Sequence, residues 1–224
     1  MSDKFNRIYN ESIQNPEVFW QKAAEDIFWF KKPSKILNKT NPPFYKWYED
    51  GVTNTCYNAL DFHIDQGKGK KTALIYDSPI TGNKSKFTYE ELKSKVSKFA
   101  GALKEQGTNK GDRVIIYMPM IPEAVIAMLA CARIGAIHSV VFGGFASNEL
   151  ASRIDDSKAK LLITASCGFE PGRTVEYKPL VDEAIKQAKH KVNKMILFQR
   201  SGHEVKLNAP VEISWDEALA NAKD

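Results

Sequence analysis

The stretch His138-Ser-Val-Val-Phe-Gly-Gly-Phe145 decides the fold class of this chain. A β-branched apolar segment stops at Gly143 and Gly144, and residues that favour a helix begin just after them. Glycines in this position let bare backbone come close to a ligand at the end of a strand in a parallel sheet. We therefore expect a buried strand, then a ligand-binding turn, then a helix.

A companion stretch runs from Ala165 to Lys178, with the sequence Ala-Ser-Cys-Gly-Phe-Glu-Pro-Gly-Arg-Thr-Val-Glu-Tyr-Lys. In this stretch a second strand is expected to end in a Gly/Pro loop that carries Arg173 and Lys178. The two strand ends lie about one βαβ unit apart. They predict one side of a site for a phosphorylated ligand.

Each of these residues also has a simpler structural interpretation. The two glycines can serve the turn alone, and Arg173 can be a surface arginine paired with a nearby carboxylate. Lys178 has Glu176 and Asp182 as ready partners. His138 is expected to be a core residue at the start of a buried strand. Cys167 has no identifiable histidine and acid partners, so we do not expect a nucleophile there.

Strands and helices alternate around the opening stretch. We expect an α/β fold, with a parallel sheet of βα units flanked by helices, because Val/Ile-rich strands alternate with helical segments. Ligands bind such sheets outside the carboxyl ends of the strands, which are here residues 117–120, 142–145, 165–173 and 199–202. The expected strands are residues 112–118, 137–142, 160–165 and 195–198, and the expected helices are residues 123–133 after Pro122, 147–156 and 180–189. A hairpin at residues 72–87 and a helix capped by Thr88 and Glu91 precede them.

The first 65 residues predict a helical and irregular extension. Asn15-Pro16-Glu17 starts a helix that is expected to reach about Phe30, and a proline-broken aromatic segment follows at residues 41–47. A short helix is expected at residues 54–64, before a lysine- and glycine-rich break at residues 66–72. Met118 and Met120, at the end of the first parallel strand, could line a pocket, but core is the better expectation. Tyr45, Trp47 and Tyr48 could stack on a base, but we expect them to form an aromatic core that packs against the main domain.

Composition excludes several classes of protein. The chain has 224 residues, 43% of them hydrophobic, and a net charge of +5, as in an ordinary globular protein. No nucleic-acid motif is present, and the longest apolar run, residues 124–132, is too short to span a bilayer, so we expect neither nucleic-acid nor membrane partners. Three widely spaced cysteines favour a reducing compartment, taken as the cytoplasm, and provide no metal site.

Several longer stretches resemble the N-terminal part of short-chain acyl-CoA synthetases of the acetyl-/propionyl-CoA synthetase type, within the adenylate-forming superfamily. Phe87-Thr-Tyr-Glu-Glu-Leu92 is similar to the first core motif of adenylating domains. Residues 117–123 and 130–145 are near-verbatim family stretches. Residues 15–20, 46–51 and 54–61 are similar to the family's N-terminal extension.

The resemblance implies a ligase that joins a short-chain carboxylate to CoA through an acyl-adenylate, using ATP with Mg²⁺ and releasing AMP and pyrophosphate. Phe142, Gly143 and Gly144 would lie beside the CoA nucleotide and the pantetheine entry. Glu170-Pro171-Gly172-Arg173 would match the loop that meets the CoA phosphates. Acetate-type relatives tend to carry arginine at position 170, so the glutamate weakens that expected contact.

The resemblance also sets expectations for the protein as a whole. Residues 76–79, 166–168, 170–171 and 175–180 look more like propionate-type members, so we expect propionate to be favoured over acetate. Residues 1–65 would be the family's N-terminal extension, and residues 66–224 the first part of the AMP-binding domain, truncated before the ATP phosphate loop. The 224 residues would then contain no catalytic residue and no metal site, and would be inactive alone.

Two alternatives stay open beside the ligase. One is a non-catalytic CoA-binding module, and the other is an interaction module in which the aromatic N-terminal segment docks on a partner or a second subunit. A homo-oligomer is also expected to be possible, because a sheet that is cut off at Asp224 should expose a raw edge or apolar surface. The mitochondrial matrix is the alternative compartment.

Overall fold

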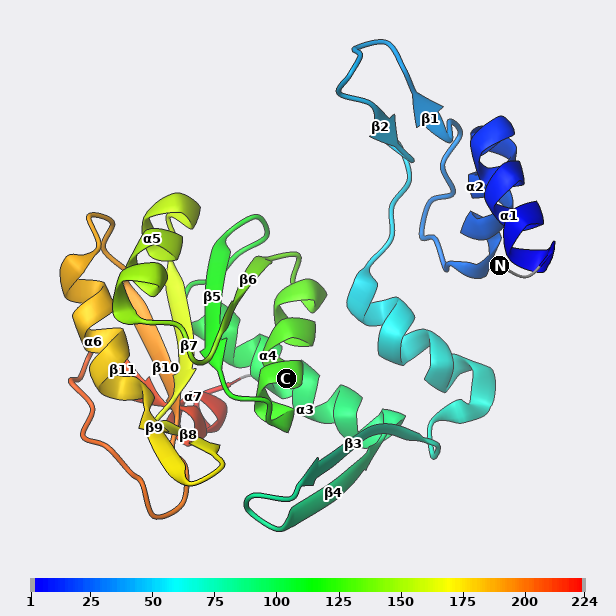
Figure 1. Cartoon of the computed structure of the whole chain (residues 1–224). Coiled ribbons are helices and arrows are strands. Elements are labelled where there is room, and N and C mark those ends of the chain that lie inside the picture. Colours follow the sequence, from blue (N-terminus) through cyan, green and yellow to red (C-terminus); the bar gives the residue numbers. More distant parts are fainter. Residues whose placement is uncertain (1–2, 223–224) are drawn as a thin grey trace. The chain divides into compact units, whose positions relative to one another are not determined.

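The chain folds into two compact units. The structure, a computed structural model, describes residues 3–222 and is shown in Figure 1. The units are Met1–Asn58 and Ala59–Asp224. The larger unit contains a five-stranded sheet flanked by helices, in which every neighbouring pair of strands is parallel. The predicted α/β fold class is confirmed.

The parallel sheet has the strand order β11-β10-β7-β5-β6. Its strands are β5 (Arg113–Met118), β6 (Ile137–Phe142), β7 (Leu161–Ala165), β10 (Lys194–Phe198) and β11 (Glu212–Ser214). Residues of β5, β7 and β10 are almost all buried, as the apolar runs predicted. β11 was not predicted.

Helices cover the sheet in two groups. α3 (Tyr89–Glu105) packs against α4 (Pro122–Arg133) and α7 (Trp215–Ala220), whereas α5 (Ser147–Ser157) packs against α6 (Tyr177–Gln187). Alternate residues of one strand face opposite ways, so each group of helices covers its own face of the sheet. Ile115, Leu162 and Leu197 share a buried cluster with residues of α5 and α6. On the helix α3 side, the rings of Phe99 and Trp215 are stacked with centroids 3.7 Å apart.

Local sequence signals explain where the helices begin. At the start of α3 the Thr88 hydroxyl accepts a hydrogen bond from the Glu91 amide, and the Glu91 carboxylate accepts one from the Thr88 amide, which completes the predicted capping box. Pro122 opens α4 as predicted. α6 begins at Tyr177, three residues before the predicted start. α7 was not predicted.

Two antiparallel hairpins adjoin the sheet. The first, β3 (Thr72–Ser78) with β4 (Asn83–Thr88), was expected. The second, β8 (Cys167–Glu170) with β9 (Arg173–Glu176), was expected only as a Gly/Pro loop. Its turn consists of Pro171 and Gly172. Gly172 has a φ of 75°, as the third position of a type II turn requires.

β6 differs from its prediction as a buried strand. It occupies one edge of the sheet, and Ile137, Val140 and Phe142 are exposed, as is His138. His138 is therefore not the core residue that was predicted. An apolar run predicts a strand but does not distinguish an edge from the centre of a sheet.

The smaller unit differs from the prediction in two places. It has an additional helix at its start, and its second helix is shorter than predicted. α1 (Asp3–Gln14) was not predicted, and α2 (Pro16–Ala23) continues only as a 3₁₀ turn, Ala24–Asp26. The chain is extended from Ile27 because other partners hold it there: the Phe28 amide donates to Asn58 Oδ1 at 2.8 Å, and the Trp29 indole donates to the Ala24 carbonyl at 2.9 Å. The prediction that this helix reaches Phe30 was therefore wrong.

The remaining elements of this region are short. β1 (Leu37–Asn38) and β2 (Lys46–Trp47) pair as a small antiparallel ladder. Trp47 lies against Trp20 with centroids 6.1 Å apart, but Trp47 and Tyr45 are 42% and 51% exposed, so the prediction of both as core residues was wrong. The helix expected at residues 54–64 is wound as two π-helical turns, Tyr57–Asp61 and Ile64–Lys68. It therefore extends into the expected lysine/glycine break.

Candidate functional site

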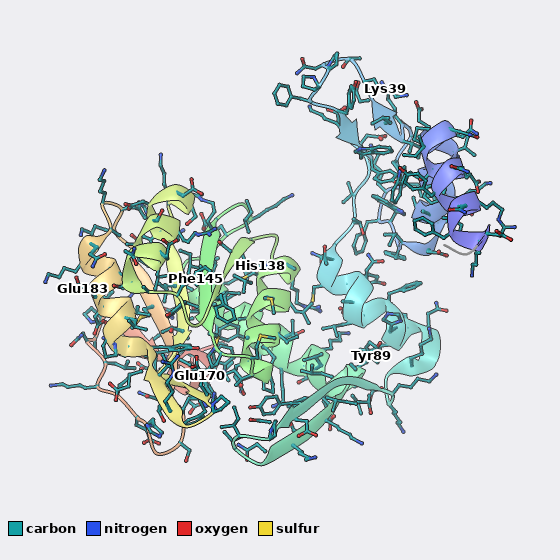
Figure 2. The ribbon with its side chains drawn as sticks, viewed as in Figure 1. Lys39, Tyr89, His138, Phe145, Glu170 and Glu183 are labelled. Atoms are coloured by element: carbon teal, nitrogen blue, oxygen red, sulfur yellow. The ribbon has the colours of Figure 1, made fainter. Side chains whose placement is uncertain are left out.

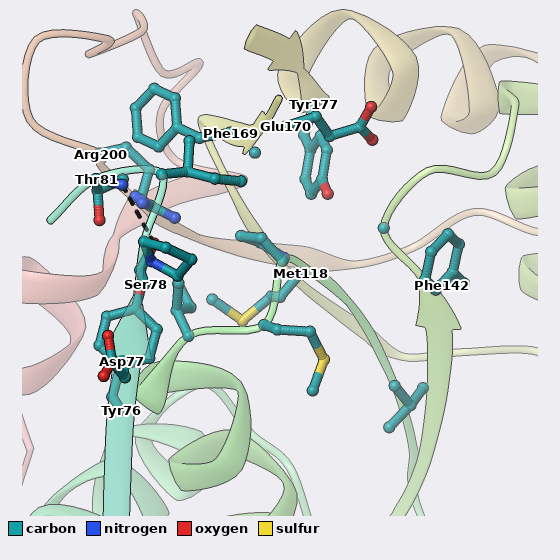
Figure 3. Close-up of a pocket in the computed structure, with 18 of the residues that line it drawn as sticks. Tyr76, Asp77, Ser78, Thr81, Met118, Phe142, Phe169, Glu170, Tyr177 and Arg200 are labelled. Atoms are coloured by element: carbon teal, nitrogen blue, oxygen red, sulfur yellow. Dashed lines mark hydrogen bonds between the residues drawn. The ribbon is translucent and has the colours of Figure 1, made fainter. Parts of the chain in front are cut away.

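The candidate site lies where the sheet changes its direction of winding. The chain leaves β5 towards α4 on one face, and leaves the adjacent β7 towards α6 on the other face. In open α/β sheets this switch point opens a crevice outside the carboxyl ends of the strands. A cavity of about 360 Å³ occupies this position and is shown in Figure 3. Its walls come from the ends of β5 and β6, from β8, from Tyr177 and Arg200, and from the tip of the β3–β4 hairpin.

Tyr177 fills the space between two strand ends. Its side chain is only 4% exposed, and its hydroxyl lies so close to Gly143 that a Cβ at that position would clash with it. The same Cβ would lie 2.7 Å from the Met118 carbonyl oxygen, and one at Gly168 would lie 2.7 Å from the Tyr177 hydroxyl. The close approach that requires glycine at position 143 is therefore to Tyr177 and β5.

A second tyrosine holds the turn after β6. The Tyr117 hydroxyl donates a hydrogen bond to the Phe145 carbonyl at 2.7 Å, and the rings of Tyr117 and Tyr177 lie 5.0 Å apart. Burial, together with the neighbouring Tyr117, raises the pKa of Tyr177 to about 12. Tyr177 therefore presents a neutral hydroxyl to the cavity near neutral pH.

The two stretches singled out in the sequence meet at this cavity. Phe142, Gly143 and Glu170 all line it. A Cβ on Gly144 would lie 4.0 Å from Glu170 Oε1, so the turn after β6 faces the β8–β9 hairpin. Pro171 and Gly172 form the tip of that hairpin and are exposed.

Arg173 pairs with Glu170 across the hairpin. Arg173 Nη2 lies 2.6 Å from Glu170 Oε2, and Arg173 Nε lies 2.7 Å from the same oxygen. The register of the hairpin sets this pair, because Glu170 and Arg173 are direct partners on either side of the two-residue turn. The arginine thus has the carboxylate partner that the simpler interpretation expected. Arg173 is exposed and does not line the cavity itself, whereas its partner Glu170, labelled in Figure 2, does.

Other residues considered from the sequence have structural roles. Lys178 is buried and binds Asp182 Oδ2 at 2.7 Å and Glu212 Oε1 at 3.2 Å, so it is not available to a ligand. Cys167 is buried, and this burial raises the pKa of its thiol. Its thiol therefore stays protonated near neutral pH, which disfavours a nucleophile.

The two methionines at the end of β5, Met118 and Met120, behave differently. Both line the cavity, as Figure 3 shows for Met118. Met118 is buried as predicted, whereas Met120 is 85% exposed, so its prediction as a core residue was wrong. Met120 lies beyond the end of β5, where the chain has left the sheet.

Arg200, like Tyr177, lines the cavity but was not among the site residues expected from the sequence. It follows β10, within the predicted strand end at residues 199–202, and lines the cavity while being only 9% exposed. Its guanidinium carbon lies 4.7 Å from the centre of the Phe169 ring. The position of Arg200 at a strand end was the signal in the sequence that could have identified it. Its contact with Phe169 could not be foreseen, because strand β8, which carries Phe169, was not predicted.

Two family matches divide the chain. The AMP-binding enzyme family matches residues 62–222, and the family described as acetyl-coenzyme A synthetase N-terminus matches residues 5–59. No helix among residues 3–222 is long and apolar enough to cross a bilayer.

Curated relatives and a solved structure agree with these matches. The human acyl-CoA synthetase short-chain family member 3, mitochondrial, is 54% identical over 213 residues, which are 95% of this chain and 31% of that protein. The acetyl-coenzyme A synthetase of Streptomyces avermitilis is 46% identical over 212 residues, 95% of this chain and 32% of that protein. The acetoacetyl-CoA synthetase structure from Streptomyces lividans has a TM-score of 0.83 at 22% identity, covering 96% of this chain and 32% of that one. The chain thus spans about a third of the length of these proteins.

Proposed function

Because the chain belongs to the AMP-binding enzyme family, we propose that the full-length protein is an ATP-dependent acid–thiol ligase that makes short-chain acyl-CoA. The name of the 54% identical human relative supports a short-chain acyl-CoA synthetase. A carboxylate oxygen would attack the α-phosphorus of ATP and expel pyrophosphate. The CoA sulfur would then attack the acyl carbon and expel AMP, which regenerates the enzyme.

We assign the CoA-binding side of this reaction to the cavity at the strand ends. The observation that carries the assignment is the meeting of the turn at Phe142, Gly143 and Gly144 with the hairpin of Glu170 and Arg173 around one cavity. A long ligand with an apolar arm and phosphates fits a cavity with largely apolar walls and an exposed arginine on the adjoining hairpin.

The finer features of the proposal follow from the resemblance. We propose that propionate is favoured over acetate, and that ATP is used with Mg²⁺. We retain residues 1–65 as an N-terminal extension and residues 66–224 as the first part of the AMP-binding domain. The compartment is proposed to be the cytoplasm, with the mitochondrial matrix as the alternative that the name of the human relative supports.

Pyrophosphate release tests the proposal. The product of the complete gene is expected to release pyrophosphate when ATP, Mg²⁺ and propionate are all present, and more slowly with acetate. The 224-residue chain is expected to release none, because no residue of it is assigned to attack on ATP. Release by the short chain would contradict the second expectation, and no release by the complete product with any short-chain acid would contradict the function.

A non-catalytic CoA-binding module is the second candidate. It is favoured by the fact that every residue assigned here belongs to the CoA side of the reaction. Saturable CoA binding by the complete product, without release of pyrophosphate, would favour this module over the ligase.

A further inference from the structure

Arg200 differs from the other charged side chains that are buried in residues 3–222. Asp61 binds Arg133 and Lys93, and Lys178 binds Asp182 and Glu212. Arg200 is as buried as these residues, yet no carboxylate of the described residues lies within 4.0 Å of its guanidinium. The Arg200 nitrogens are not among the fully buried unpaired polar atoms of residues 3–222, so they reach the cavity and are open to a partner that arrives from outside.

Two of the carboxylates around the cavity are paired with other cations. Asp77 Oδ2 binds Lys84 at 2.9 Å, and Glu170 Oε2 binds Arg173 at 2.6 Å. Glu123 lines a neighbouring hollow of about 640 Å³ that Arg200 also borders. Burial raises the pKa of Glu123, whereas the charge of Arg200 acts in the opposite direction, so Glu123 is the carboxylate that partly offsets the Arg200 charge. Among residues 3–222 no ion pair within 4.0 Å joins Glu123 and Arg200.

The position of Arg200 suits an anion in the cavity. Its guanidinium is held over the Phe169 ring at 4.7 Å, a contact that occupies one face and leaves the edge nitrogens free to donate. Ile121, which precedes the first residue of α4, lines the same cavity, so the positive end of that helix also points towards it. Figure 3 shows Arg200 beside Thr81 of the β3–β4 hairpin, at the side of the cavity away from Phe142.

We propose that Arg200 is an anion-binding residue of this cavity that receives a phosphate group of a nucleotide ligand through its forked N–H donors. This inference rests on the proposed function, and adds a second cationic contact on the side of the cavity opposite Phe142. Arg173 is exposed and sits in an ion pair, whereas Arg200 has no ion pair among residues 3–222 and is largely buried, and a charge-assisted hydrogen bond is stronger in such a setting.

Titration calorimetry of the chain with CoA, ATP and inorganic pyrophosphate tests the proposal. Arg200→Met keeps a long apolar side chain on Phe169 and removes the charge, and Arg200→Lys keeps the charge and removes the fork. Arg153→Gln, on the exposed face of α5, is the matched control. Circular dichroism and thermal unfolding of each variant establish that it is folded.

We expect Arg200→Met to weaken phosphate-ligand binding about tenfold or more, Arg200→Lys to weaken it less, and Arg153→Gln to leave it unchanged. If Arg200→Met weakens the binding of CoA, the phosphate that Arg200 receives belongs to CoA. If it weakens the binding of ATP alone, that phosphate belongs to ATP. Unchanged binding of both ligands by folded Arg200→Met overturns the proposal while leaving the proposed function intact.

Further outcomes distinguish failure of the proposed CoA site from failure of the anion site at Arg200. If the unmodified chain binds neither CoA nor ATP, the proposed CoA site fails, and the pyrophosphate titration decides the anion site. Pyrophosphate binding that is lost in Arg200→Met then upholds the anion site, and no pyrophosphate binding overturns it. Competition by sodium propionate but not by pyrophosphate would also overturn it, because the site would then take a carboxylate.

Discussion

The two glycines of one turn have different neighbours, and this difference predicts different costs of substitution. A Cβ at Gly143 meets the Tyr177 hydroxyl and, at 2.7 Å, the backbone carbonyl of Met118. A Cβ at Gly144 meets the Phe142 side chain at 3.1 Å and otherwise only Glu170 Oε1 at 4.0 Å, and Phe142 is exposed and can move. We expect Gly143→Ala to lower the free energy of unfolding by about 1–3 kcal/mol, and Gly144→Ala to lower it by less than about 1 kcal/mol.

Urea unfolding of the two alanine variants measures this difference. Adding Tyr177→Phe to Gly143→Ala removes one of the two clashes, so the double variant is expected to be less destabilised than the sum of the single changes. Equal costs at positions 143 and 144 would contradict the assigned role of Tyr177.

The Glu170–Arg173 pair predicts a change in affinity without a change in stability. Both side chains are partly exposed, so Glu170→Gln is expected to change the free energy of unfolding by less than about 1 kcal/mol. It also releases Arg173 from a competing carboxylate, and CoA binding is expected to tighten several-fold, more at low salt than at high salt. Calorimetry at two salt concentrations measures this effect, with Arg173→Gln as the opposite case. Weaker CoA binding by Glu170→Gln would mean that Glu170 itself contacts the ligand.

Between elements, Asp61 ties a helical segment to α3 and α4. Its carboxylate oxygens lie 2.8 Å and 3.0 Å from two nitrogens of Arg133, and 3.2 Å from Lys93 Nζ. Burial alone would raise the pKa of Asp61, but the hydrogen bonds from Arg133 and Lys93 bring it below the usual value of 3.8. We expect Asp61→Asn to cost about 1–3 kcal/mol at neutral pH, because the partner cations are only partly exposed.

The pH dependence of that cost follows from the lowered pKa. A carboxyl group whose pKa is lower in the folded state contributes stability above its unfolded pKa of about 3.9, and loses it as the pH falls through the folded value. The difference in urea unfolding between Asp61→Asn and the parent chain is therefore expected to be full at pH 7 and to shrink as the pH falls below about 3.9 towards the lowered folded pKa. Asp156→Asn, an exposed carboxylate on α5, is the control. A difference that stays constant as the pH is lowered from 7 to about 2 would indicate that packing, not charge, causes the loss.

Elements with strong local signals could be predicted from the sequence. β6 has the predicted bounds because two glycines end it, and α4 begins at Pro122 because proline suits the first helical turn. The hairpin of β8 and β9 was missed, since each strand has only four residues and Pro171-Gly172 was interpreted as part of one loop. β6 was expected to be buried because the pattern within a strand carries no information about its neighbours in the sheet.

The candidate site could be predicted in part. Phe142, Gly143, Gly144 and Glu170 were expected to come together, and topology alone justified this, because parallel strands end at one edge of a sheet. Tyr177 was not expected, because its contact with Gly143 depends on where α6 begins. Whether these residues bind CoA stays a prediction.

For the whole molecule, the exposed edge of the sheet predicts self-association. Ile137 and Val140 of β6 are 56% and 55% exposed, on a strand whose outer edge is unpaired among residues 3–222. Such an edge invites pairing with a second copy. We expect the chain to associate with rising concentration in sedimentation velocity, and Ile137→Lys to reduce this association. Val18→Lys, at an exposed apolar residue of α2, is the control, and equal effects of both changes would contradict a role for the edge.

The assignment of CoA to this cavity is tested by calorimetric titration of CoA into the folded 224-residue chain, because the CoA side of the reaction is the part assigned to these residues. We expect saturable binding of one CoA per chain, weakened about tenfold or more by Arg173→Gln through loss of a charge-assisted contact to phosphate. No saturable binding by a folded chain, or binding that Arg173→Gln leaves unchanged, would contradict the assignment of CoA to this cavity.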